Sequence, residues 1–151
     1  MFLNIVTDEE LLASEVVKTI LLILIIGGII YNLIRLLRRG RKGRKTINIL
    51  ILLFLFALFF YVGREYLIEG AMLRKPQYVT GTTIDFCSVF ALGKGIKFEY
   101  EVNGKKFRNC NTYYPVAKES IKLPGGKYSV RYAQEFPDRG RMDFQKGGNK
   151  K

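Results

Sequence analysis

Two long apolar stretches joined by a short arginine-rich segment constrain this 151-residue chain more than any other feature. Residues 16–37 read VVKTILLILIIGGIIYNLIRLL, and residues 47–68 begin with INILILLFLFALFFYV. An α-helix rises about 1.5 Å per residue and the hydrocarbon core of a bilayer is about 30 Å thick, so about 20 apolar residues can cross it. The sequence therefore predicts a hairpin of two transmembrane helices, at 16–37 and 47–68.

Polar residues are rare within the two predicted spans. Lys18 and Arg35 lie near the ends of the first span, where long side chains can reach the lipid headgroups. Asn32, Asn48 and the Gly27-Gly28 pair are typical of helix packing. Because the span centres hold no carboxylate, a channel or transporter is not expected.

The segment between the spans, residues 38–45, carries the basic side chains that determine topology: Arg38, Arg39, Arg41, Lys42, Arg44 and Lys45. Short basic loops beside a membrane stay on its cytoplasmic side. Both chain termini are then expected on the extracytoplasmic side of a bacterial inner membrane. A cleaved signal peptide is not expected, since the exported N-terminal arm, residues 1–15, is acidic and the first apolar run is long.

After a connector at residues 69–77, the pattern changes to apolar residues at every second position, which is typical of β-strands. Strands are expected at 78–89, 96–102, 105–113, 127–133 and 141–144, with a helical turn at 115–121. Four to five antiparallel strands with one apolar face predict a small sheet or a partly open barrel over residues 78–144. The tail, residues 145–151, is expected to be disordered.

The clearest strand, Ile96–Val102, is followed by Asn103-Gly104, the dipeptide that two-residue hairpin turns prefer. Such a turn fixes the pairing of the hairpin. Its opposed pairs would be Glu101 with Lys106, Glu99 with Arg108, and Tyr100 with Phe107. Opposite charges and aromatic pairs are both favourable at opposed positions, which supports this register.

The strand at 78–89 carries one of the two cysteines, Cys87, and its partner strand is not fixed by the sequence. Ile84 and Phe86 are expected on one face, with Thr83, Asp85 and Cys87 on the other. Both Cys87 and Cys110 fall in the part predicted to lie in an oxidising compartment, where disulfides form.

A disulfide is feasible if 78–89 pairs with the strand that carries Cys110. If it pairs with 96–102 instead, Cys110 lies two strands away, at about 10 Å, which is too far for a bond. A disulfide between Cys87 and Cys110 and two buried free thiols are therefore both open interpretations.

Several kinds of chemistry are missing from the sequence. The chain has no histidine, which excludes a Ser-His-Asp or Cys-His arrangement, and it has no phosphate-binding GxxxxGK[ST] loop. Two cysteines without a histidine leave too few soft ligands for a metal site. We therefore expect no catalytic residues, no cofactor and no metal.

The net charge is +12, of which +8 lies from Arg64 onwards. High basicity often indicates nucleic-acid binding. Here the densest basic cluster lies between two predicted spans, where topology accounts for it, so a nucleic-acid partner is not expected.

Five short motifs follow one another in the exported part. They are Gly81 to Asp85, Phe98 to Lys105, Pro124-Gly125-Gly126, Val130 to Tyr132, and Pro137 to Asp143. In this order they resemble bacterial membrane-anchored proteins of the domain of unknown function 3592 family, over roughly residues 78–144. That family is uncharacterised, so the resemblance implies a fold and a membrane anchor but no activity.

These features predict a membrane-anchored, non-enzymatic binding or assembly module that presents a basic β domain outside the cytoplasm. Its expected partners are the lipid bilayer and another envelope protein or an anionic surface, and a homo-oligomer could form through the transmembrane hairpin. The alternative is an immunity or exclusion protein that neutralises a toxin acting at the envelope, since the +8 domain would attract an acidic toxin.

Overall fold

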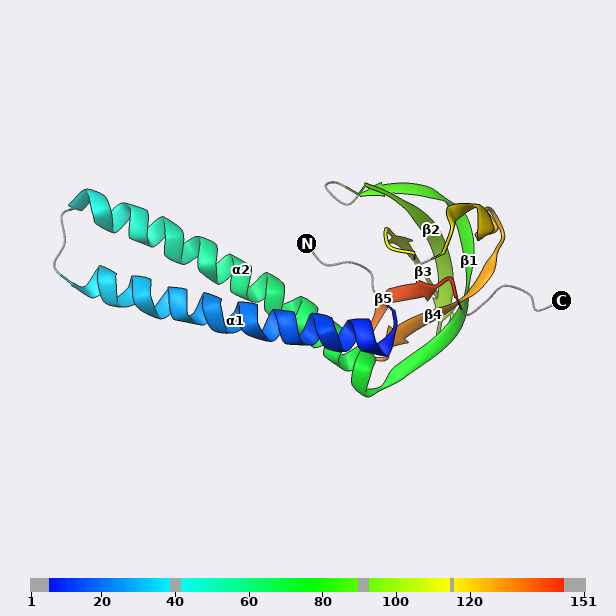
Figure 1. Ribbon diagram of the computed structural model, residues 1–151, viewed down its shortest axis with the longest axis horizontal. Coiled ribbons are helices and arrows are strands. Elements are labelled where there is room, and N and C mark those ends of the chain that lie inside the picture. Colours follow the sequence, from blue (N-terminus) through cyan, green and yellow to red (C-terminus); the bar gives the residue numbers. More distant parts are fainter. Residues whose placement is uncertain (1–5, 39–41, 90–92, 115, 146–151) are drawn as a thin grey trace. The chain divides into compact units, whose positions relative to one another are not determined.

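The computed structural model describes residues 6–38, 42–89, 93–114 and 116–145. Two long apolar helices precede a five-stranded antiparallel sheet that is nearly closed into a barrel (Figure 1). The chain divides into two compact units: the helical hairpin from Leu12 to Gly70, and the barrel, which includes the chain up to Leu11 and from Ala71 onwards. The predicted disorder of the tail after Gln145 falls outside the described residues, as do residues 1–5 of the N-terminal arm and 39–41 of the basic segment.

Helix α1 (Asp8–Leu37) begins well before the predicted residue 16. The sequence Thr7-Asp8-Glu9-Glu10 explains this earlier start. The Glu10 backbone N–H donates to the Thr7 hydroxyl oxygen at 3.4 Å, and the Thr7 hydroxyl donates to the Glu10 carboxylate at 2.7 Å. A threonine cap followed by acids in the first turn stabilises a helix N-terminus, so residues 8–15 of the acidic arm are helical.

Helix α2 (Lys42–Arg74) continues beyond the predicted end at residue 68, and strand β1 (Pro76–Val89) begins almost directly after it. The connector predicted at 69–77 is therefore wrong as a separate segment. The sequence from Ala71 to Arg74 consists of good helix formers, and the helix ends only before Pro76, because a proline disfavours helical geometry at the residue before it.

Both helices are long and apolar enough to cross a membrane. Only 6% and 11% of the residues in their apolar windows are buried, whereas a core helix of a soluble protein would be mostly buried. Within the hairpin the helices lie side by side and antiparallel, and a Cβ placed on Gly28 would lie 3.4 Å from the Leu55 side chain (Figure 1). The glycine therefore lies at the helix contact, as the packing interpretation predicted.

The barrel follows the strand order β3-β2-β1-β4-β5. The remaining strands are β2 (Gly93–Val102), β3 (Lys105–Asn111), β4 (Lys127–Ala133) and β5 (Phe136–Asp143), with a short 3-10 helix, η1 (Lys118–Ser120), between β3 and β4. β1 pairs with β2 through its second half and with β4 through its first half, which answers the question that the sequence left open. β5 starts earlier than the predicted residue 141.

The predicted hairpin register is confirmed. Glu99 lies opposite Arg108, Tyr100 opposite Phe107, and Glu101 opposite Lys106. The turn residues Asn103 and Gly104 have φ values of 51° and 76°, as a type I′ turn requires.

Alternate residues of the strands point inward and form one core. It contains Ile96, Phe98, Tyr100, Val102, Ile121, Tyr128, Val130, Met142 and Phe144. The rings of Phe98 and Tyr100 stack at 5.8 Å between centroids, and those of Tyr100 and Phe107 at 5.7 Å. The apolar face expected of the sheet is thus the inside of the barrel.

The gap between β3 and β5 is bridged by side chains. Asn109 donates to the carbonyls of Asp138 and Gly140 at 3.0 and 2.9 Å, and Asn111 donates to the Met142 carbonyl at 2.8 Å. Carbonyls at every second residue of a strand point to the same side, so two asparagines spaced by two residues can reach three of them. The residue numbers of β3 and β5 increase in the same direction across this seam, so the two strands run parallel to each other.

Candidate functional site

Arg131 of β4 holds the ends of both helices to the barrel. Its side chain is 4% exposed, and its guanidinium donates to the Met72 carbonyl at 3.2 and 2.7 Å, to the Val6 carbonyl at 3.0 Å and to the Asp8 carboxylate at 2.6 Å. The Met72 carbonyl would pair with the N–H of Pro76 in a longer helix, and proline has none. Arg131 supplies the missing donor at the negative end of the α2 dipole.

The outer face of β4 and β5 is therefore covered. Arg131, Arg141 and Asp143 alternate with the core residues Val130 and Met142, so they point out of the barrel, yet all three are buried. Their cover includes the chain from residue 6 to residue 10, which lines a small hollow with the end of β5. This face is occupied by the protein itself.

Tyr113 adds a second contact to the same segment. Its hydroxyl donates to the Glu10 carboxylate at 2.9 Å, and this hydrogen bond to a negative group raises the pKa of Tyr113. The start of α1 is thus fixed to the barrel from two sides, by Arg131 and by Tyr113.

The outer face of β1, β2 and β3 carries exposed charges of both signs. Glu99 accepts a hydrogen bond from Arg108 at 2.7 Å and lies 3.8 Å from the Lys106 ammonium. The hydrogen bond from Arg108 is the main reason why the pKa of Glu99 is lowered. The register placed Lys106 opposite Glu101, but its ammonium reaches diagonally to Glu99, since long side chains also contact diagonal neighbours.

Exposed apolar side chains also occur on β1. Tyr78, Ile84 and Phe86 are 51%, 36% and 49% exposed, and they are the only large apolar side chains of the described barrel residues with this exposure. The pairing of β1 with β2 shifts between Thr83 and Asp85, so Ile84 is the extra residue of a β-bulge.

The face assignment predicted for 78–89 is accordingly wrong at the bulge. Thr83 is buried inside the barrel, while Asp85 is exposed. A strict alternation cannot continue through an inserted residue, and no pattern in the sequence marked Ile84 as that residue.

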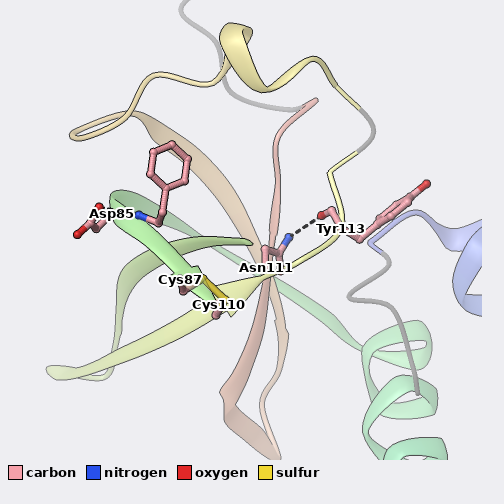
Figure 2. Close-up of a disulfide and its surroundings, with 6 residues drawn as sticks. Asp85, Cys87, Cys110, Asn111 and Tyr113 are labelled. Carbon is pink, nitrogen blue, oxygen red and sulfur yellow. Dashed lines mark hydrogen bonds between the residues drawn. A yellow bond between two sulfur atoms is a disulfide. The ribbon is translucent and has the colours of Figure 1, made fainter. Parts of the chain in front are cut away.

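Cys87 and Cys110 are joined by a disulfide, with 6.1 Å between their Cα atoms (Figure 2). This outcome corrects the geometric argument from the sequence, because β1 does pair with β2 and the two cysteines do lie two strands apart. The distance expected for alternate strands, about 10 Å, assumes a flat sheet. The sheet curls sharply here.

The curl takes place at Gly95 of β2, which lies between the two cysteines. A Cβ on Gly95 would come within 3.0 Å of the Cys110 sulfur and 2.9 Å of the Asn111 carbonyl carbon. Only a residue without a side chain allows β1 and β3 to approach each other across β2.

The helical hairpin holds a buried ion pair that the sequence interpretation missed. Lys18 of α1 pairs with Glu69 of α2, and neither side chain has exposed surface. The Ser14 hydroxyl donates to the same carboxylate at 2.8 Å. Lys18 therefore does not reach out to headgroups as predicted, and Glu69 is not part of a connector.

The remaining predicted positions fall into two groups. Of the basic segment, Arg38 and Lys45 are exposed, whereas 39–41 and the side chains of 42–44 lie outside the described residues. Among the described residues, no group of three or more Cys, Asp or Glu side chains is arranged to hold a metal ion.

No protein-family model, curated protein or solved structure matches this chain. The resemblance to the domain of unknown function 3592 family therefore stays a prediction from the motifs. What the geometry defines is a class of architecture with two units: an apolar helical hairpin, and a small, nearly closed barrel that includes the start of α1 and the end of α2.

Proposed function

We propose that the protein is a membrane-anchored, non-enzymatic binding module that presents the barrel on the extracytoplasmic side of a bacterial inner membrane. The main support is the asymmetry of the barrel surface. The outer face of β4 and β5 is covered by the helix ends, and the outer face of β1, β2 and β3 remains exposed. Strand β1 also exposes three large apolar side chains, Tyr78, Ile84 and Phe86. A barrel attached on one face offers the other face to a partner.

The membrane placement rests on the two helices and on the basic segment. Their apolar side chains are largely exposed, which is favourable only in a lipid environment. The basic segment joins the helix ends that are distant from Asp8 and Arg74. If that segment stays in the cytoplasm, the start of α1, the end of α2 and the barrel bonded to them lie outside.

A protein partner suits the exposed face better than a nucleic acid or a sugar chain. Small five-stranded barrels of the OB type bind oligonucleotides and oligosaccharides on the face of their second and third strands. Single strands bind such faces by stacking their bases on aromatic rings. Here the outward residues of β2 and β3 are charged residues, glycines or cysteine, while Phe98 and Tyr100 point inward.

Site-specific photo-cross-linking in intact cells tests this proposal. A photoreactive amino acid replaces Tyr78 or Phe86, two exposed side chains of β1, and in a matched control it replaces Glu135, which is exposed in the turn between β4 and β5. We expect one defined protein adduct from the first two positions and none from the control. Absence of any adduct at Tyr78 and Phe86, with the barrel correctly exported, would argue against a binding module.

Topology is tested separately with a compartment-sensitive reporter fused after Lys151. Reporter activity only in the cytosol would contradict the extracytoplasmic placement. The alternative role as an immunity or exclusion protein stays a prediction from net charge, and the acids Glu99 and Glu101 among the cations of the exposed face give it no particular support.

A further inference from the structure

We propose that Cys87 and Cys110 are the substrate of a protein thiol oxidant outside the cytoplasm, and that the bond between them completes the folding of the barrel. This inference rests on the proposed extracytoplasmic side. It names a partner that the binding proposal does not include: a protein that carries a reactive disulfide of its own.

The position of the bond in the sheet supports this inference. Cys87 lies opposite Gly95, and Cys110 lies opposite Lys97, so β2 runs between the two cysteines. In the folded barrel the sulfurs meet across β2, where the sheet curls at Gly95. The pairing of β2 with both β1 and β3 brings the two thiols together, so we expect the native bond to form once these three strands have assembled.

The two cysteines are also accessible from outside the barrel. Both cysteines point to the outside of the barrel and are only partly buried. Figure 2 shows the disulfide between the two strands, beside Asn111. A thiol at either position can be reached by another protein, whereas a core thiol could not.

The bond also fixes the end of β3, where the barrel closes against β5. Across the seam, Asn111 of β3 donates to the Met142 carbonyl of β5. The disulfide attaches β3, through the residue next to Asn111, to β1 at the opposite side of β2. The end of β3 is thereby fixed at the place where the barrel closes with side-chain hydrogen bonds instead of a backbone ladder.

The chemistry balances with one co-reactant. One cysteine thiolate attacks the disulfide of the oxidant and forms a mixed disulfide, and a thiol of the oxidant leaves. The second cysteine thiolate then attacks the mixed disulfide, which forms the Cys87–Cys110 bond and releases the oxidant as a dithiol. Two electrons pass from the barrel to the oxidant, and the two protons of the barrel thiols end on the two thiols of the oxidant.

The test uses the full-length chain expressed in bacteria, quenched with acid and treated with a maleimide of high mass. In cells with the envelope oxidant, we expect no mass shift without reductant and two added groups after reduction. In cells that lack the oxidant, we expect two free thiols and at least a tenfold faster cleavage of the barrel by added protease, because the uncrosslinked strands open more often.

Single variants trap the proposed partner. Cys87→Ser or Cys110→Ser leaves one thiol, and we expect at least one of the two variants to form a mixed disulfide of higher mass that reductant removes. The double variant Cys87→Ser/Cys110→Ser is the control and should form none. Two free thiols in wild-type cells, equally rapid oxidation without the oxidant, or no adduct from either single variant would overturn the inference.

These outcomes are distinct from a failure of the binding proposal. Cytosolic activity of the reporter after Lys151 would remove both proposals. An exported barrel that cross-links a partner through Tyr78 or Phe86 but keeps two free thiols would remove only the thiol-oxidant inference.

Discussion

Replacing Lys18 or Glu69 alone should destabilise the helical hairpin far more than replacing both. Neither side chain has exposed surface, so each single variant leaves one buried charge without its main counter-ion. Removing one partner of a buried ion pair costs about 3–5 kcal/mol, whereas replacing both by apolar residues of similar volume is close to neutral or stabilising. The structure therefore predicts a coupling energy of at least about 3 kcal/mol between the two positions.

The assay is a double-mutant cycle on purified protein in a mild detergent, with the helical circular dichroism followed during titration with a denaturing detergent. The variants are Lys18→Met, Glu69→Leu and the double variant. Ser14→Ala should cost less, about 1.5–3 kcal/mol, because it removes only a hydrogen bond to a charged group. Arg64→Met is the matched control for loss of an exposed charge, and it should change stability by about 0.5 kcal/mol or less.

The decisive result is the stability of the double variant. If Lys18→Met/Glu69→Leu loses as much stability as the two single variants added together, the charges act independently and the reasoning from the buried pair is refuted. A double variant near the wild-type stability, beside two unstable single variants, is the outcome that the geometry predicts.

Three further predictions concern the barrel. Tyr100→Phe should destabilise it by about 1–3 kcal/mol in chemical denaturation, because the buried N–H of Gly140 loses its acceptor at 2.8 Å. Because burial raises the pKa of Tyr100 to about 12, the wild-type barrel should also lose stability as the pH rises from about 10 to 12, and the variant should lose less. Arg108→Ala should raise the pKa of Glu99 toward its ordinary value in an NMR titration, and Lys106→Ala should raise it less; equal effects would contradict the dominant hydrogen bond from Arg108. Gly95→Val should prevent formation of the disulfide, detected as two alkylatable thiols in exported protein, because its side chain would occupy the space of the Cys110 sulfur.

The sequence predicted those parts of the fold that depend on local patterns. The hairpin of β2 and β3 was predicted residue by residue because Asn103-Gly104 imposes a two-residue turn and every opposed pair then follows. The two apolar helices followed from their length, and β4 coincides with the predicted range 127–133.

The boundaries that were missed depended on polar residues near the predicted spans. Thr7-x-x-Glu10 is a capping signal that could have placed the start of α1 correctly. After residue 68, Glu69 and Gly70 interrupt the apolar run, so the pattern favours a connector where the structure continues the helix. Recognising that Lys18 lies at a matching depth on the other helix would have favoured a buried pair.

The contacts that define the site depend on the tertiary arrangement of the strands. Nothing near Arg131 in the sequence indicates that it would reach Met72 and Val6, since those residues are far away along the chain. The sequence leaves the disulfide between Cys87 and Cys110 undecided, because the alternation of apolar and polar residues does not encode the curl of the sheet at Gly95. A glycine inside a strand is only a weak signal that two neighbouring strands approach each other closely. Here the close approach brings Cys87 and Cys110 together across Gly95.

The junction of α2 and β1 has one residue, Lys75, between the last helical residue and the first strand residue. The last turn of α2, from Ala71, and the whole of β1 therefore belong to the same compact unit. The Arg131 bonds to Met72 join this last turn to β4, so a displacement of the turn would act on β1 and β4 together. Inserting a single residue at this junction would shift β1 by one position relative to Met72, so the Met72–Arg131 hydrogen bonds and the pairing of β1 with β4 could no longer both form in their present register.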